Sequence, residues 1–222
     1  GLAHLATLQQ EVGLIAMARP KSDIEPRILA AARARFLSDG VDGASLRGIA
    51  TDAGTSIGMV YYYFATKDEL FFGVVEEQYQ KLLRDIETAI APDVPVRERV
   101  ERLFMRVARL SEEELLMMRL VLREALTSNT RFARLRARFE TGHLPLIARL
   151  IADGYAGGSF NRGLHPMVAM LSMAGLASVP QLIRRALDGH LPFPDAPAGE
   201  DLSKLLVGVL FSGTGTAATP SK

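Results

Sequence analysis

The sequence predicts an all-α protein made of a small three-helix domain followed by a larger helical domain. Three observations carry this prediction. Apolar residues recur at helical spacing along most of the 222 residues. Residues that cap helix N-termini, Ser45, Ser56 and Thr66, each stand just before a periodic segment. Gly54 separates two short periodic segments, where a tight turn with positive φ is expected.

Composition excludes several classes of protein. The chain has no cysteine, so disulfides, thiol catalysis and zinc fingers are excluded. Its formal net charge is +1, so no overall basicity indicates a nucleic-acid partner. The apolar run from Leu164 to Leu176 is broken by His165 and Pro166 and falls short of a bilayer span, so we expect no membrane partner and a cytoplasmic location.

Catalytic and metal-binding patterns are missing from the sequence. No two histidines are spaced i, i+4, the spacing that would let them bind one metal ion from a helix. The four histidines are His4, His143, His165 and His190. No glycine-rich phosphate loop and no GxSxG nucleophile elbow occurs. We therefore expect no catalytic residues, no metal, no cofactor and no enzymatic activity.

The first 21 residues form an N-terminal extension or arm. Apolar residues from Leu2 to Ile15 recur at helical spacing, which fits a short amphipathic helix. Met17 looks like an ordinary protein start, so the preceding residues fit an extension equally well. Arg19 and Lys21 lie on a tail that can reach a DNA backbone or minor groove.

Residues 22–66 have the spacing of a helix-turn-helix domain. The first helix begins near Ser22 or Asp23, with Ser22 and Glu25 as a capping box, and Gly40 ends it. Ser45 opens the second helix. Gly54 supplies the turn before the third helix, which Ser56 opens. A plain helical hairpin has the same spacing and is the alternative.

The third helix carries four adjacent aromatic positions that cannot all face one core. Val60 and Phe64 share one face and form the buried stripe. Tyr61 and Tyr62 lie on the other side with Gly58, and an exposed patch of this kind marks a binding surface. In a helix-turn-helix, this helix enters the DNA major groove.

The segment LRGIATDAGTSIGMVYYYFATKDEL resembles the DNA-binding segment of the TetR family of bacterial transcriptional repressors. The resemblance covers residues 22–72 and rests on the Ile49-Ala50 and Ala53-Gly54 pairs and on the stretch from Ser56 to Leu70. It implies a homodimer on a palindromic double-stranded operator, with a second domain that binds a small effector and dimerises. The positions where family members contact DNA are then Ser45, Arg47, Ser56, Ile57, Gly58, Met59, Tyr61, Tyr62, Tyr63 and Lys67.

Two features of this segment differ from a typical helix-turn-helix that recognises base edges by hydrogen bonds. Ile57 and Met59 are apolar where hydrogen-bonding side chains would read bases, and they suit a thymine methyl group instead. From Met17 to Leu70 the basic and acidic residues are equal in number, so phosphate attraction depends on the placement of charges.

We expect residues 67–211 to form the ligand-binding and dimerisation domain. Residues 212–222 are expected to be a disordered tail. We expect helices at 67–90, 96–110, 111–127, 131–155 with a kink at Gly142 and Pro145, 165–187 with an interruption near Pro180, and 201–211. The helices at 165–187 and 200–211 are apolar on most sides, which favours a dimer interface of four helices over a buried central helix.

An effector pocket is expected among the middle helices, where most of the methionines lie. Methionine also packs ordinary cores, which is the alternative. A mostly apolar pocket with a few polar groups suits a lipophilic small molecule. The candidate ligand-binding residues are Phe104, Met105, Met117, Leu120, Arg123, Glu124, His143, Met170 and Met173.

The sequence thus predicts a sequence-specific transcriptional regulator, a repressor that a small, largely apolar effector releases from its operator. The alternative is a DNA-binding regulator without an effector, controlled by a partner or by its own abundance. An enclosed cavity in the second domain separates the two hypotheses.

Overall fold

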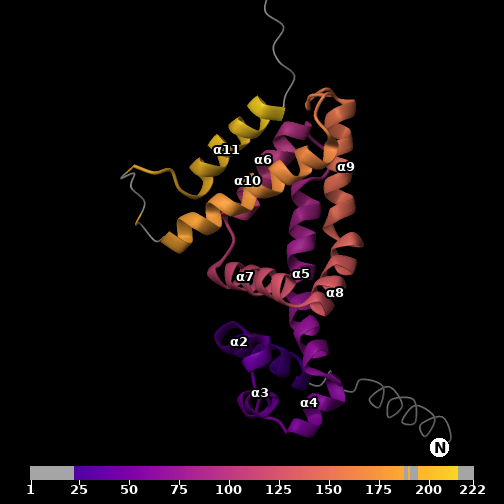
Figure 1. Cartoon of the computed structure of the whole chain (residues 1–222), viewed down its shortest axis with the longest axis vertical. Coiled ribbons are helices and arrows are strands. Elements are labelled where there is room, and N and C mark those ends of the chain that lie inside the picture. The colour runs from indigo at the N-terminus through magenta and orange to yellow at the C-terminus, as the bar shows by residue number, and fades with distance from the viewer. Residues whose placement is uncertain (1–22, 188–189, 191–194, 215–222) are drawn as a thin grey trace, which may run out of the picture. The chain divides into compact units, whose positions relative to one another are not determined.

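The computed structural model describes residues 23–187, 190 and 195–214, and this part of the chain consists of helices and connecting segments without a β-strand (Figure 1). The all-α prediction is confirmed. The chain divides into two compact units, Gly1–Val74 and Val75–Lys222. The division falls inside a helix that was expected to open the second domain at residue 67. The two units are described separately below.

From residue 23 onward, where the structure describes it, the N-terminal unit contains three helices and the start of a fourth. They are α2 (Ile24–Gly43), α3 (Leu46–Asp52), α4 (Ile57–Tyr63) and the first turns of α5 (Lys67–Ala89). Ser45 and Ser56 cap α3 and α4 as expected, since their hydroxyl groups accept hydrogen bonds from the third residue of each helix. Gly54 has a φ of 62°, which confirms the turn that a side chain would strain.

The first helix differs from expectation at both ends. Asp23 precedes α2 without a side-chain cap, and Ser22, the other expected cap, lies outside the described residues. Gly40 has a φ of 77° and breaks the regular helix, but one more helical turn follows it as far as Gly43. Val41 in that turn is fully buried, so its packing explains why the turn persists.

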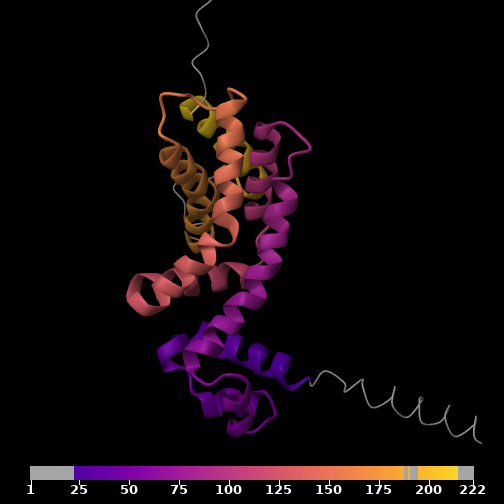
Figure 2. The same ribbon diagram turned by 90° about the vertical axis from the view of Figure 1, so that its right-hand side faces the viewer.

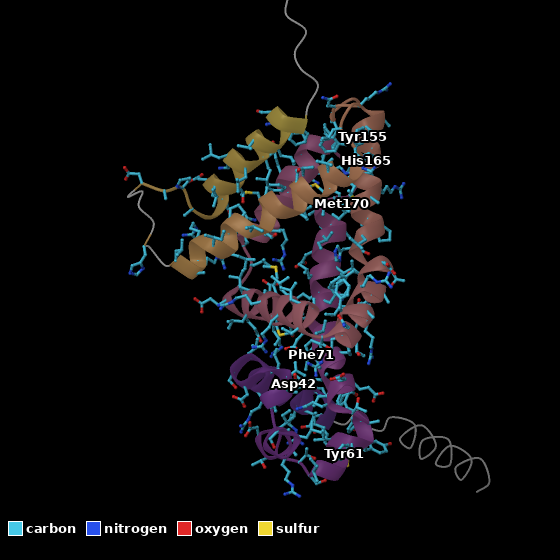
Figure 3. The ribbon with its side chains drawn as sticks, viewed as in Figure 1. Asp42, Tyr61, Phe71, Tyr155, His165 and Met170 are labelled. Carbon is cyan, nitrogen blue, oxygen red and sulfur yellow. The ribbon has the colours of Figure 1, made fainter. Side chains whose placement is uncertain are left out.

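The core of the N-terminal unit joins all four helices. Phe36 of α2 meets Phe71 of α5 edge to face with ring centroids 6.1 Å apart, and Figure 3 marks Phe71 inside this unit. Phe64 packs against Gly73, where an added Cβ would lie 2.8 Å from the Phe64 ring. Phe64 therefore anchors the end of α4 to α5, although it is half-buried rather than fully buried as expected.

The described residues of the C-terminal unit form the rest of α5 and six further helices (Figures 1 and 2). These are α6 (Val96–Ala108), α7 (Glu112–Thr127), α8 (Asn129–Glu140), α9 (His143–Ala156), α10 (Pro166–Leu187) and α11 (Gly199–Thr214). Ser111 and Glu114 form a complete capping box at the start of α7. The last helix ends at Thr214 rather than at Phe211, so the expected tail begins with three helical residues. The rest of that tail lies outside the described residues.

The single helix expected over 131–155 is two helices. The chain leaves the helical path at Thr141 and Gly142 and resumes it at His143. An added Cβ on Gly142 would lie 2.1 Å from the hydroxyl oxygen of Tyr79, so the break brings the backbone against a side chain of α5. The position expected for the kink, Gly142, was correct, but the helix ends there and a new one begins instead of bending.

The main core of the C-terminal unit lies where α6, α9, α10 and α11 pack together. A buried polar chain fixes α10 against α11. The Gln181 amide nitrogen donates to Ser203 Oγ at 3.2 Å and to the Gly199 carbonyl at 3.1 Å. Ser203 in turn donates to the carbonyl of Phe104 on α6. These hydrogen bonds therefore fix the alignment of α6, α10 and α11 relative to one another.

Helix α10 is long and apolar enough, by length and composition alone, to cross a membrane, contrary to the expectation from its apolar runs. The core helix of a soluble protein passes the same test. Here only one stripe of α10 is buried against neighbouring helices, and it consists of Ala169, Met173, Ala177 and Gln181. The expected interruption near Pro180 is wrong, because α10 runs through this proline without a break.

Candidate recognition helix and ligand cavity

Helix α4 has one buried face and one exposed face. Val60 is fully buried, whereas Tyr61 is 52% and Tyr62 77% exposed. Figure 3 shows Tyr61 at the surface of the N-terminal unit. Because exposed tyrosines contribute little to their own fold, the two rings are available to a partner. Tyr63 is half-buried, and its ring meets that of Tyr62 edge to face at 5.2 Å.

The other residues expected at DNA lie around this face. Arg47 on α3 is exposed, and Ile57 and Met59 on α4 are half-buried. Ser45 and Ser56 are exposed although their hydroxyl groups cap the two helices. Gly58 is exposed, and the contact nearest to an added Cβ there is the Ser56 hydroxyl at 3.7 Å. The fold itself therefore does not require a glycine at position 58.

Lys67 has a structural role that the sequence did not reveal. Its ammonium group donates to the carbonyl of Asp42 at 2.8 Å and to that of Ala44 at 3.3 Å. It therefore ties the start of α5 to the segment between α2 and α3. An ammonium group has three N–H donors, so one remains for another acceptor.

A cavity of about 300 Å³ lies inside the C-terminal unit. A stripe on α5, formed by Val75, Tyr79, Leu82 and Ile86, lines one side of it. The remaining lining residues come from α5 to α10 and are Gln78, Leu103, Arg106, Val107, Leu110, Glu114, Met117, Met118, Val121, Phe139, His143 and Ser178. A mostly apolar lining with a few polar groups is typical of small-molecule sites.

Tyr79 and His143 form the polar end of the cavity. The Tyr79 hydroxyl oxygen lies 2.7 Å from Nδ1 of His143 and accepts the His143 backbone N–H at 2.9 Å. Because Gly142 has no side chain, the hydroxyl reaches this position. Burial lowers the pKa of His143, and the nearby positive charge of Arg138 lowers it further. The imidazole is therefore neutral near pH 7.

The charges beside this polar end are paired. Arg138 holds Glu76 with two hydrogen bonds of 2.7 and 2.9 Å, and its guanidinium lies 4.5 Å from the centre of the Tyr79 ring. The hydrogen bonds from Arg138 lower the pKa of Glu76. The Tyr79 ring is thereby clamped between a cation and His143, whose ring centroid lies 5.8 Å away.

The charged residues of the cavity lining, Arg106 and Glu114, are paired as well. Arg106 donates to Asp85 at 2.8 Å and also to Glu114. The second carboxylate oxygen of Glu114 accepts the backbone N–H of Ser111 at 2.8 Å. Hydrogen bonds from Ser111 and Arg106 outweigh the effect of burial and lower the pKa of Glu114. The cavity wall thus presents no uncompensated charge.

Of the residues expected to bind a ligand, some line the cavity and the others lie outside its lining. Met117 and His143 line the cavity. Glu124 is instead buried in a pair with Arg131 at 2.6 Å, which Arg123 joins. Met105 borders a surface hollow on α6. The others pack in or against cores outside the cavity lining, and they are Phe104, Leu120, Met170 and Met173.

Sequence reasoning missed Tyr79 and most of the lining. The helical spacing of Val75, Tyr79, Leu82 and Ile86 on α5 is a signal that was available in the sequence. Nothing in the sequence indicates that Tyr79 meets His143 across 64 residues. Among residues 23–187, 190 and 195–214, no cluster of three or more His, Asp or Glu side chains could hold a metal ion.

Comparison with known proteins identifies the N-terminal unit. Residues 28–74 match the profile of a family described as bacterial regulatory proteins, tetR family. The N-terminal unit therefore contains a DNA-binding domain of the tetR family. The chain is also 32% identical over 78 residues to the HTH-type transcriptional regulator PksA of Bacillus subtilis (strain 168). That match covers 35% of this chain and only 38% of PksA.

Solved structures of TetR-family proteins share the fold over most of the chain. A regulatory protein of the family from Rhodococcus RHA1 superposes with a TM-score of 0.69 and 22% identity, covering 89% of this chain and all of that one. The regulator FadR from Bacillus subtilis, in complex with stearoyl-CoA, also gives 0.69 at 18% identity, covering 84% of this chain and 97% of that one. The similarity of fold therefore extends to the C-terminal unit.

Proposed function

We propose that the chain is a sequence-specific transcriptional repressor that binds a palindromic operator as a homodimer and is released by a small effector. The observation that carries the proposal is the exposed face of α4 in a TetR-family domain. Tyr61 and Tyr62 point outward there, while Val60 and Phe64 anchor the helix. A helix-turn-helix places this helix in the major groove.

The proposed DNA contacts fall into two kinds. Hydroxyl and cationic groups of Ser45, Arg47 and Tyr61 suit phosphate oxygens, which set the register on the duplex. Ile57 and Met59 suit thymine methyl groups at base edges. Tyr62, Tyr63, Ser56 and Gly58 complete the surface, and Lys67 offers its remaining N–H to a phosphate.

The proposed homodimer uses α10 and α11. Exposed apolar residues lie at four-residue intervals along α10, apart from Gly175 in that series, and two more lie on α11. They are Met167, Leu171, Val179, Ile183, Leu187, Leu205 and Val209. A contiguous apolar face of this length favours burial against a second copy of the chain.

The cavity in the C-terminal unit supports control by an effector. A regulator controlled only by abundance or by a protein partner has no use for a space of about 300 Å³ among these helices. An effector acts by binding one conformation of the dimer more tightly than another, so it shifts operator affinity by that difference. At 18% identity, the stearoyl-CoA bound by FadR is not carried over to this chain.

The experiment that tests the proposal is selection of bound fragments from genomic DNA of the source organism, followed by titration of the selected fragment. We expect a palindromic site bound far more tightly than random DNA of equal length. Tyr61→Ala should weaken binding to both DNAs alike, because a phosphate contact carries no sequence information. Equal binding of the wild-type protein to selected and random DNA would refute the proposal.

A further inference from the structure

We propose that the cavity selects an uncharged, largely apolar molecule with a hydrogen-bond acceptor, and that Nε2–H of His143 donates to that acceptor. This inference rests on the proposed function, since it names the class of effector for the same cavity. Tyr79 is the positioning residue that sets which imidazole nitrogen carries the proton. Three features of the cavity wall lead to this assignment.

The first feature is the tautomer of His143. The Tyr79 hydroxyl accepts the His143 backbone N–H, so its own proton is free to be donated. The acceptor within reach is Nδ1 of the same histidine at 2.7 Å. A neutral imidazole with Nδ1 as acceptor carries its proton on Nε2. No acceptor for that proton is found in the described parts of the chain, and the ring lines the cavity.

The second feature is the charge balance. Arg106 faces Asp85 and Glu114, and Arg138 faces Glu76, so the arginine of the lining and the arginine beside Tyr79 are both already paired. An anionic ligand would have to compete with these carboxylates, and a cationic ligand with the guanidinium groups. An ion without a partner pays a large desolvation cost on entering an apolar cavity. The wall thus disfavours ions of either sign.

The third feature is the state of the other neutral polar groups. The Ser178 hydroxyl also lines the cavity, but it donates to the Ala174 carbonyl at 2.7 Å. The Gln78 amide is the other neutral donor in the lining. It projects from α5 on a side chain with three torsions, whereas the imidazole is held by Tyr79 and by the start of α9. The fixed donor loses less entropy on binding and so determines selectivity.

The test uses four probes with one naphthalene scaffold on the full-length protein: 2-acetylnaphthalene, 2-ethylnaphthalene, 2-naphthoate and 2-naphthylmethylammonium. Calorimetry gives each dissociation constant. We expect the ketone to bind about five- to tenfold more tightly than the hydrocarbon, as for one net hydrogen bond. Both ions should bind more weakly than the ketone. Tighter binding of either ion, equal binding of ketone and hydrocarbon, or no binding of any probe would overturn the inference.

Variants locate the donor. His143→Leu should abolish the preference for the ketone, whereas His143→Gln should keep it because its amide can place an N–H near the position of Nε2. Gln78→Leu is the matched control and should leave the preference intact. Loss of the preference in Gln78→Leu but not in His143→Leu would contradict the role of His143. Tyr79→Phe should reduce the preference without abolishing ketone binding.

A measurement on the wild-type protein does not depend on the folding of any variant. Nitrogen-15 NMR of the histidine side chains should show the His143 proton on Nε2, and the ketone but not the hydrocarbon should shift that resonance. A proton on Nδ1 would overturn the inference. Operator binding is measured in parallel. Specific DNA binding without probe binding refutes this inference alone, and probe binding without specific DNA binding refutes the proposed function alone.

Discussion

The hydroxyl group of Tyr79 on α5 lies 2.7 Å from Nδ1 of His143, the first residue of α9, and it also accepts that residue's backbone N–H. One side chain therefore satisfies an otherwise unpaired donor at a helix N-terminus and also contacts a ring nitrogen of the first side chain of that helix. The contact exists because the preceding residue, Gly142, has no Cβ.

Gly142→Ala is expected to destabilise the C-terminal unit. The added Cβ would lie 2.1 Å from the Tyr79 hydroxyl oxygen, so the ring or the backbone must move. We expect a loss of about 1–3 kcal/mol, as for other overpacked sites, measured by thermal or urea unfolding. Gly213→Ala is the control, since an added Cβ there meets nothing within 4 Å. Equal stability of the two variants would contradict the close approach.

Acid is expected to weaken folding through His143. Burial lowers its folded pKa below the ordinary value of 6.5, so the unfolded chain binds a proton more readily than the folded one. Stability should therefore be complete above the unfolded pKa and fall as the pH drops below it towards the folded pKa. Urea unfolding between about pH 7.5 and pH 5 measures this slope. In His143→Gln the slope in this window should be smaller, and an unchanged slope would exclude His143 as its source.

Lys67→Ala is expected to reduce both stability and DNA affinity. The variant loses the hydrogen bonds to the carbonyls of Asp42 and Ala44, with an expected cost of about 1 kcal/mol. Arg47→Ala, at an exposed position on α3, is the comparison and should weaken DNA binding without that cost. Thermal unfolding and DNA titration of both variants distinguish the two roles.

Gly58→Ala should change stability and DNA binding in opposite directions. Alanine favours a helix over glycine by up to about 1 kcal/mol, and the space at this position is open. The melting temperature should therefore rise. If the α4 backbone approaches DNA closely, the added methyl group should weaken operator binding at least several-fold. Unchanged operator affinity would show that DNA does not approach the helix at this point.

Leu171→Glu should dissociate the proposed homodimer. Leu171 is 58% exposed in the single chain and lies in the middle of the apolar stripe on α10. Two buried glutamates facing each other across a symmetric interface would be strongly unfavourable. Leu126→Glu on α7, where leucine is 79% exposed, is the matched control. Sedimentation should give half the wild-type mass for the first variant only, and a dimeric Leu171→Glu would contradict the interface.

The sequence predicts the N-terminal unit well because its signals are local. Ser45 and Ser56 cap the helix that immediately follows them, and Gly54 makes the turn between the same two helices. The split of Val60 and Phe64 from Tyr61 and Tyr62 follows from helical periodicity within one segment. Each of these inferences requires only residues a few positions apart.

The C-terminal unit is predicted less well because its determinants are distant in sequence. The break between α8 and α9 depends on Tyr79, which belongs to another helix. The pairing of Glu124 with Arg131 removes a carboxylate that seemed available to a ligand. Phe104, Met117 and Met173 are all large apolar residues on helices of this unit, so the sequence does not distinguish them. Only the packing of the helices decides that Met117 lines the cavity whereas the other two lie in the core.

The polar chain from Gln181 through Ser203 to Phe104 has a consequence for how such proteins diverge. Its buried hydrogen bonds fix how α10, α11 and α6 align with one another. The exposed apolar stripe on α10 is therefore not needed to hold these helices in register. Substitutions on the outer face can then alter which subunits recognise each other without disturbing the fold of either. Related regulators in one cell could in this way acquire separate pairing preferences through a few surface changes.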